Sequence, residues 1–183
     1  MYNNQRIIKE LKPYIPVADI FRIYEKEAGC AFLDSSLVND LGRYSIIGRA
    51  PYLKLVKDGD TFTVNGKPET GKTFEDYMRE YLNTHEDKNE CPLPIVSGAI
   101  GYFSYDYGRE QMGVPTGEKD LVTIPEAVLT FYDCFIVEDC REKRTYLVSN
   151  GITGNAPELI RSMEKEIQEN VKFGKISVSE AEK

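Results

Sequence analysis

A two-residue turn signal restricts the possible folds of this chain more than any other feature of its sequence. The dipeptide Asp58-Gly59 joins two runs in which apolar and polar residues alternate, Tyr52–Lys57 and Asp60–Asn65. Asp-Gly between two such runs is typical of a tight β-hairpin, and a hairpin pairs its two strands antiparallel. A second turn of this kind is expected at Cys140–Lys143. The chain therefore requires an antiparallel sheet.

Further strands and three helices complete the expected fold. Runs rich in β-branched and aromatic residues predict strands elsewhere. These runs are Ala31–Ser36, Arg43–Arg49, Ile95–Tyr105, Ala127–Val137 and Arg144–Ser149. Several strands between widely spaced helices favour an α+β fold, with largely antiparallel sheets and helices packed on one side, over a regular βαβ repeat.

Each predicted helix has a start signal and one apolar face. The first follows Pro16 and stops near Gly29, with apolar residues at intervals of three and four. Thr73 is suited to cap the second helix, and Asn155 the third, because a short polar side chain at this position can accept a free backbone N–H. A single apolar face on each helix predicts that the helices lie on the sheet.

Charge and cysteine content narrow the class of protein. The formal net charge is −7, and a nucleic-acid or anionic membrane surface would need a clustered basic field instead. No apolar run approaches the roughly 20 residues of a membrane span. The first residues, Met1–Arg6, lack the apolar core of a signal peptide, and the four cysteines show no metal-binding spacing. We therefore expect a cytoplasmic protein with reduced thiols, no nucleic-acid partner and no membrane partner.

One segment matches the phosphate-binding loop of nucleotide-binding proteins. Gly66–Thr73 has the required Gly, Lys and Thr spacing and leads into a predicted helix. The preceding strand, Thr61–Asn65, alternates and is the second arm of the predicted hairpin, whereas the strand before a true phosphate loop is parallel and continuously apolar. We therefore interpret the segment as an exposed turn that leads into a capped helix, and reject nucleotide binding.

Three stretches in order resemble component I of the chorismate-utilising synthases. Phe32–Ser36 followed by Gly42–Gly48 is similar to the family's Leu-Leu-Glu-Ser strand and the strand after it. Gly98–Asp106 is similar to its Gly-x-x-Gly-Tyr-x-x-Tyr-Asp element. Ile124–Ala127 leads into an aromatic strand that contains Asp133. Together the stretches cover roughly residues 14 to 150.

The resemblance implies a domain organisation and a role. Residues 1–170 would be the N-terminal domain of component I, and residues 171–183 a linker toward a C-terminal catalytic domain that binds chorismate and Mg²⁺. The two domains would together form a β-sandwich flanked by helices. This chain would need no cofactor and have no catalytic residue and no metal ligand of its own, and the sequence contains no acid–base pair or nucleophile–histidine arrangement. A glutamine amidotransferase subunit would be the partner.

Two branches of the family and one independent reading are open. The full protein would aminate chorismate to aminodeoxychorismate for p-aminobenzoate and folate synthesis, a branch to which Phe32–Ser36 and Gly42–Gly48 look closer. The alternative is anthranilate synthase, which serves tryptophan synthesis and binds tryptophan as a feedback inhibitor. A third hypothesis is a free-standing domain that binds an amino acid.

The resemblance also maps an effector pocket for tryptophan or a similar ligand onto this chain. Its lining would be Leu33, Asp34, Ser35, Arg43, Tyr44 and Ser45. An ammonium group could meet Asp34 or Ser35, and a carboxylate could meet a guanidinium. Asp34 stands where the family more often has Glu. Strand alternation places Leu33 and Ser35 on one face and Asp34 on the other, so that Asp34 could instead hold a neighbouring loop.

Two features of the strands predict structural roles. Gly98 and Gly101 within a strand indicate a close backbone approach or a bulge. Asp133 shares a strand face with Phe131 and Phe135, so we expect it to be buried and to need an arginine, a group of N–H donors or a bulge.

Overall fold

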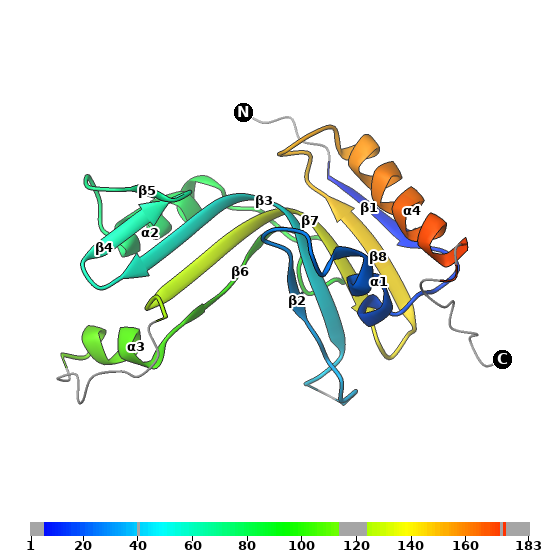
Figure 1. Ribbon diagram of the computed structural model, residues 1–183, viewed down its shortest axis with the longest axis horizontal. Coiled ribbons are helices and arrows are strands. Elements are labelled where there is room, and N and C mark those ends of the chain that lie inside the picture. The colour runs from blue at the N-terminus through cyan, green and yellow to red at the C-terminus, as the bar shows by residue number, and fades with distance from the viewer. Residues whose placement is uncertain (1–5, 40, 114–123, 173, 175–183) are drawn as a thin grey trace. The chain divides into compact units, whose positions relative to one another are not determined.

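A computed structural model describes residues 6–39, 41–113, 124–172 and 174 as eight strands and four helices arranged in two compact units. The strand order is β1-β8-β7-β3-β4-β5, with β2 paired to β3 and β6 paired to β7. The pairs β1–β8, β2–β3, β3–β4, β4–β5 and β7–β8 are antiparallel, which confirms the predicted α+β class. Figure 1 shows two long strands, β3 (Tyr44–Asp58) and β7 (Ala127–Asp139), which both units share.

The first unit combines the outer ends of the sequence with parts of the two long strands. Its other elements are β1 (Ile7–Leu11), α1 (Val17–Tyr24), β2 (Ala31–Leu33), β8 (Arg144–Ser149) and α4 (Ala156–Lys172). Helices α1 and α4 share one core cluster with strand residues such as Ile47, Ile136 and Leu147, all fully buried. The two helices therefore pack on one side of these strands, as predicted from their single apolar faces.

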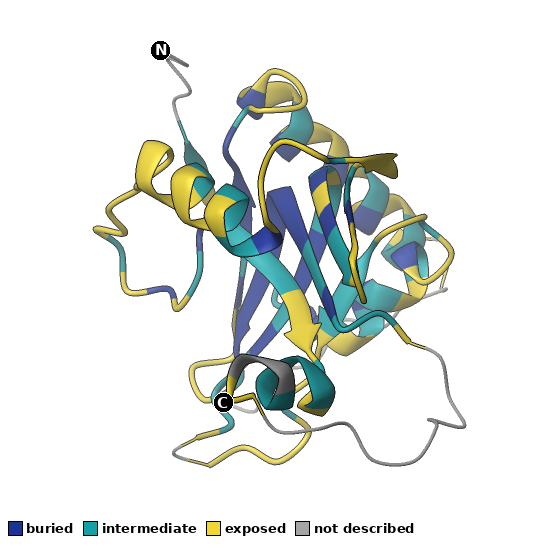
Figure 2. Cartoon of the chain, turned by 90° about the vertical axis from the view of Figure 1, so that its left-hand side faces the viewer, coloured by how far each residue is buried: buried dark blue, intermediate teal, exposed yellow. Residues whose placement is uncertain are grey.

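The second unit has a core rich in aromatic side chains. Besides parts of β3 and β7 it contains β4 (Thr61–Val64), β5 (Lys67–Pro68), α2 (Phe74–Thr84), β6 (Gly98–Phe103) and α3 (Tyr105–Gln111). The first residue of β6, Gly98, belongs to the first unit. Phe74 is almost fully buried and makes edge-on contacts with Phe62, Phe103 and Tyr107. Aromatic edges and faces of opposite partial charge attract one another, so this cluster fixes α2 against the strands. In Figure 2 the buried residues lie mainly on strands, and the exposed residues lie mainly in turns and on helices.

The predicted helix caps and one predicted turn are confirmed. Thr73 accepts the N–H of Asp76 at 3.1 Å, and Asn155 accepts that of Glu158 at 3.3 Å. Strand β7 turns into β8 through residues 140–143, since Asp139 pairs with Arg144. The other predicted turn is shifted by one residue, because Asp58 pairs with Thr61 and leaves residues 59 and 60 as the loop.

Several element boundaries differ from the sequence prediction. The two strands expected at Arg43–Arg49 and Tyr52–Lys57 are one continuous strand, β3, in which Ala50 has a φ of 52°. Strand β1 and helix α3 were not predicted at all. Helix α4 continues to Lys172, two residues beyond the predicted domain end, and most of the predicted linker lies outside the described residues.

Gly101 confirms the expected close backbone approach. A Cβ atom at this position would lie 1.8 Å from the carbonyl oxygen of Val128 on β7, so no other residue fits without moving a strand. Close packing against β7 therefore explains why the motif Gly98–Asp106 has a glycine at position 101.

Asp133 is buried, as predicted, and is satisfied by a group of N–H donors rather than by an arginine. Its side chain is 0% exposed. Its Oδ1 accepts the N–H of Asn150 at 3.0 Å, and its Oδ2 accepts the N–H and the hydroxyl of Thr153, both at 2.6 Å. Three donors offset the cost of removing the carboxylate from water, and they fix the segment after β8.

We expect Asp133→Ala to lower the free energy of unfolding by about 2–4 kcal/mol, because three donors lose a charged partner in the interior. Urea unfolding followed by circular dichroism measures the change. Glu86→Ala, which removes an exposed carboxylate, is the matched control and should change stability by less than about 0.5 kcal/mol. Equal effects of the two substitutions would show that the Asp133 network contributes nothing.

Candidate functional site

The pairing of β2 with β3 brings the six predicted pocket residues together. Phe32 lies opposite Ile47, and Leu33 opposite Ile46, in the antiparallel register. Beyond the end of β2 the two segments stay close, and Ser35 and Ser45, ten positions apart in the sequence, are hydrogen-bonded. The chain between them forms the connection at the end of β2 in Figure 1.

Ser45 is the centre of this cluster. It is 2% exposed, and its Oγ accepts the N–H of Ser35 at 2.9 Å and donates to Oδ1 of Asp34 at 3.1 Å. The hydroxyl of Ser35 donates to the carbonyl oxygen of Tyr44 at 2.7 Å. Asp34 and Ser35 thus both bond to β3, whereas strand alternation predicted that their side chains point to opposite faces. The difference arises because β2 ends at Leu33 and the chain beyond it is no longer a regular strand.

Arg43 is fixed by a carboxylate from another part of the sequence. Its Nε lies 3.0 Å and its Nη2 2.5 Å from Oδ2 of Asp139, and its guanidinium lies 5.0 Å from the centre of the Tyr44 ring. Asp139 is 6% exposed and also accepts the N–H groups of Arg141 and Glu142. Burial alone would raise the pKa of Asp139, but the hydrogen bonds from Arg43 and from these two N–H groups outweigh it and hold the pKa below its usual value.

Sequence reasoning missed two members of the cluster, Asp139 and Cys140. The Sγ of Cys140 lies 3.6 Å from the Ser45 Oγ, and the N–H of Cys140 donates to the carbonyl oxygen of Arg43. Burial raises the pKa of the Cys140 thiol, so the group is held in its neutral form. The signal in the sequence was the predicted turn at Cys140–Lys143. Asp139 directly precedes this turn, so its carboxylate could have been expected to bind a group on a neighbouring strand.

Exposed apolar side chains lie at the end of β2 and in the connection that follows it. Leu33 is half exposed, and the exposed residues Leu37, Val38 and Leu41 follow it in the β2–β3 connection. Such side chains can contact the apolar part of a ligand that an adjacent carboxylate binds.

The described residues offer no metal site. Within residues 6–39, 41–113, 124–172 and 174, no three Asp, Glu, His or Cys side chains are grouped so that they could hold a metal ion.

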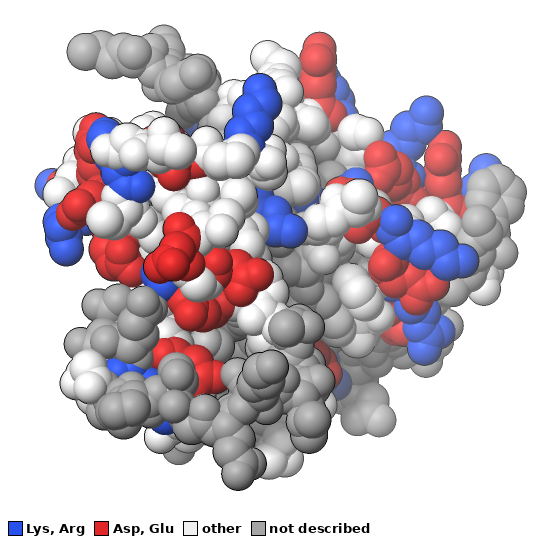
Figure 3. All heavy atoms as spheres, turned by 60° about the vertical axis from the view of Figure 1, so that its left-hand side comes forward, with Lys and Arg blue, Asp and Glu red and all other residues white. Residues whose placement is uncertain are grey.

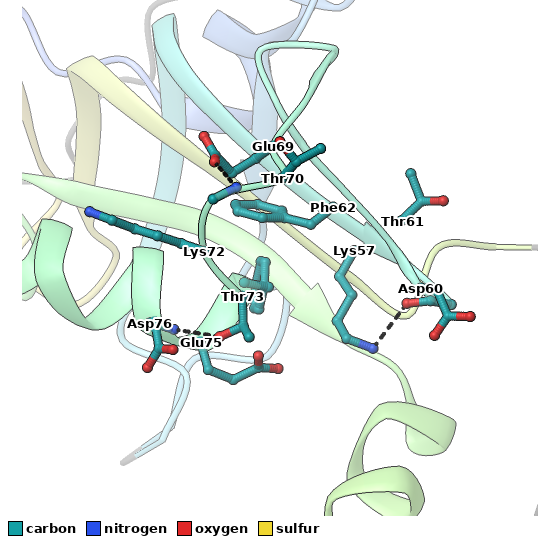
Figure 4. Close-up of a pocket in the computed structure, with 13 residues that line it drawn as sticks. Lys57, Asp60, Thr61, Phe62, Glu69, Thr70, Lys72, Thr73, Glu75 and Asp76 are labelled. Atoms are coloured by element: carbon teal, nitrogen blue, oxygen red, sulfur yellow. Dashed lines mark hydrogen bonds between the residues drawn. The ribbon is translucent and has the colours of Figure 1, made fainter.

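The last five residues of the phosphate-loop match, 69–73, line a hollow of about 590 Å³ in the second unit, shown in Figure 4. The segment contains β5, which pairs antiparallel with β4, so the parallel strand of a nucleotide-binding loop is not formed. Lys72 pairs with Glu80, and the N–H of Gly71 donates to Glu69. The lining also includes the carboxylates of Asp60, Glu69, Glu75 and Asp76. Lys57 and Lys72 also line the hollow, but each is paired with a carboxylate, Glu126 and Glu80 respectively. The four carboxylates outnumber the two lysines, and a negative lining would repel phosphate, which supports the rejection of nucleotide binding.

Helix hydropathy and surface charge were also compared with the sequence expectations. No helix in the described ranges is long and apolar enough to cross a membrane. On the face shown in Figure 3, acidic and basic side chains lie side by side and no continuous basic area is visible.

Comparison with known proteins gives relatives in one family. No family model matches the chain. It is 31% identical over 122 residues to the chloroplastic anthranilate synthase alpha subunit 2 of Arabidopsis thaliana, which covers 60% of this chain and 20% of that protein. It is 26% identical over 149 residues to anthranilate synthase component 1 of Acetivibrio thermocellus, which covers 74% of this chain and 29% of the relative.

A solved structure shares the fold. Anthranilate synthase component I from Streptococcus pneumoniae matches with a TM-score of 0.59 and 18% identity, over 74% of this chain and 31% of that structure. The chain thus spans less than a third of the length of these relatives.

We expect Ser45→Ala to loosen the cluster, because Ser35 loses its N–H acceptor and Asp34 its hydroxyl donor. Loss of about 1 kcal/mol should speed amide hydrogen exchange at Ser35 about 5-fold to 10-fold. Exchange measured by NMR tests this locally. In the control Ser36→Ala, which alters an exposed neighbour, the Ser35 amide should exchange at the original rate; faster exchange in both variants would show that Ser45 has no special role.

Proposed function

Since the chain is related in sequence and fold to the N-terminal part of component I of the chorismate-utilising synthases, we propose that it is the non-catalytic N-terminal domain of such an enzyme. The observation that carries the proposal is the sequence match to component I over 60–74% of this chain. In this role the domain supplies a scaffold, an effector pocket and contacts for its partners. The full enzyme would aminate chorismate in its C-terminal catalytic domain.

The relatives favour the anthranilate branch of the family. Each relative reported above carries the name anthranilate synthase, so amination to anthranilate for tryptophan synthesis is the first candidate. Amination to aminodeoxychorismate for p-aminobenzoate and folate synthesis is the second, because Phe32–Ser36 and Gly42–Gly48 look closer to that branch. Both reactions use the same substrate class, and this domain would serve either.

The partners and compartment follow from the same proposal. A glutamine amidotransferase subunit would deliver ammonia, and the domain's own catalytic half would be its second partner. The four cysteines are free thiols, which suits the reducing conditions of the cytoplasm.

The cluster around Ser45 is the proposed effector pocket for tryptophan or a similar ligand. Asp34 is exposed, and its Oδ1 accepts the hydroxyl of Ser45. An ammonium group can bind the other oxygen of this carboxylate. Apolar contact with an aromatic group would come from Leu33 and Tyr44. The same cluster would serve an amino-acid-binding domain without a catalytic half, which is the alternative function.

The product of the complete protein separates the candidates. With chorismate, ammonium and Mg²⁺, we expect the full-length protein to form anthranilate, identified by chromatography and mass spectrometry. Aminodeoxychorismate as the product would move the protein to folate synthesis. No turnover of chorismate by a folded full-length protein would contradict both branches and favour the binding domain.

Asp34→Asn should weaken tryptophan binding to the full-length protein about 10-fold to 100-fold, because a charge-assisted hydrogen bond to the ammonium is lost. Equilibrium dialysis measures the affinity. Asp60→Asn removes an exposed carboxylate in the second unit and is the matched control. Unchanged affinity in Asp34→Asn would show that the pocket is elsewhere.

A further inference from the structure

The chain contains two Asn-Gly pairs, and the structure gives them opposite environments. Asn65–Gly66 belongs to the second unit and Asn150–Gly151 to the first. An asparagine side chain before glycine is open to attack by the next backbone nitrogen, because glycine has no Cβ atom to hinder the approach. The two pairs have the same local chemistry, so any difference in their reactivity must come from the folded structure.

Asn65 and Gly66 form an exposed two-residue turn. Val64 of β4 pairs with Lys67 of β5, which leaves these two residues as the loop. Their φ angles are 50° and 75°, and two positive values are typical of the tight hairpin turn that favours Asn-Gly. Both residues are exposed, and a Cβ atom on Gly66 would meet nothing within 4 Å. Water and hydroxide therefore reach the turn in the folded chain.

A backbone donor is directed at the side-chain oxygen of Asn65. The N–H of Lys54 donates to Oδ1 of Asn65 at 2.7 Å, and the N–H of Asn65 donates to the carbonyl oxygen of Lys54 at 2.8 Å. Oδ1 is the atom on which negative charge develops when a nucleophile attacks Cγ. A fixed donor at this atom stabilises that charge, as the donors of an oxyanion hole do. The turn therefore combines an accessible amide with a donor that polarises it.

Asn150–Gly151 is held on both sides of the same reaction. Asn150 is 5% exposed, and its Nδ2 donates to the carbonyl oxygens of Val96 and Asp133, both at 2.9 Å. The N–H of Gly151 donates to Oγ of Ser149 at 3.3 Å. The leaving group and the attacking nitrogen are thus both bonded to other groups, so this pair reacts only when the segment opens locally.

We propose that Asn65 is a site of spontaneous covalent modification, at which the side-chain amide becomes a carboxylate while the chain stays folded. The Gly66 nitrogen loses its proton to hydroxide and attacks Cγ of Asn65. The bond from Cγ to Nδ2 breaks, and Nδ2 leaves as ammonia with a proton taken from water. Water then opens the cyclic imide at either carbonyl, which gives aspartate or isoaspartate without any oxidation or reduction. The product adds a negative charge to the turn between β4 and β5.

The test follows both pairs in one sample of the 183-residue chain. After incubation in mildly alkaline buffer, peptide mass spectrometry measures the conversion at each asparagine. We expect Asn65 to react at least about tenfold faster than Asn150, because Asn150 reacts only from locally open chains. Digestion with pepsin in acid adds no further conversion, since the glycine amide must lose its proton to attack. In urea, where neither pair is folded, the two rates should agree within about threefold.

Two variants make the result specific. In Asn65→Gln the conversion in the second unit should fall to background, because the longer side chain closes its ring more slowly. Asp133→Ala removes an acceptor of the Asn150 N–H and should speed conversion at Asn150 at least about fivefold, while Asn65 changes less than about twofold.

Three results would overturn the proposal. The first is equal conversion of the two asparagines in the folded chain, and the second is an unreacted Asn65 in a folded chain whose urea sample reacts. The third is conversion at Asn65 that falls when the fold is made more stable by cooling only as far as conversion at Asn150 does, which would place both reactions in open chains. Circular dichroism establishes that the chain and each variant are folded during the incubation.

Discussion

Burial of strand β7 is the constraint on which the first unit depends. From Thr130 to Asp139 every residue of this strand is buried, and three of these residues are carboxylic acids. A carboxylate removed from water is costly unless donors replace the lost hydration. Asp133, Glu138 and Asp139 are each no more than 6% exposed, so each must have partners.

The three carboxylates meet this requirement in three ways, and each fixes a different segment. Asp133 binds backbone N–H groups after β8. Glu138 accepts the hydroxyl of Tyr14 and the N–H of Val17, so it supplies the cap that Pro16 cannot give to α1 and places negative charge at the helix N-terminus. Asp139 binds Arg43 and orders the start of β3. The proposed pocket is therefore joined to the core of the unit through β7.

Local signals in the sequence predicted the parts of the structure that local interactions form. Thr73 and Asn155 cap their helices through neighbours three residues away, so pattern alone identifies them. Two separate strands were predicted at Arg43–Arg49 and Tyr52–Lys57, whereas the structure has the single strand β3, in which Ala50 has a positive φ. The residues of the cluster around Ser45 could be predicted because the two segments that carry them are close in sequence. The Arg43–Asp139 pair joins residues 96 positions apart and depends on tertiary packing, so it was not predicted.

We propose that this chain is a non-catalytic domain that performs no chemistry on chorismate by itself. The most direct measurement incubates the purified 183-residue chain with chorismate, ammonium and Mg²⁺ and follows chorismate loss and product formation by chromatography. The account predicts no loss beyond that of a protein-free sample. Formation of anthranilate or aminodeoxychorismate in proportion to the amount of chain added would contradict it.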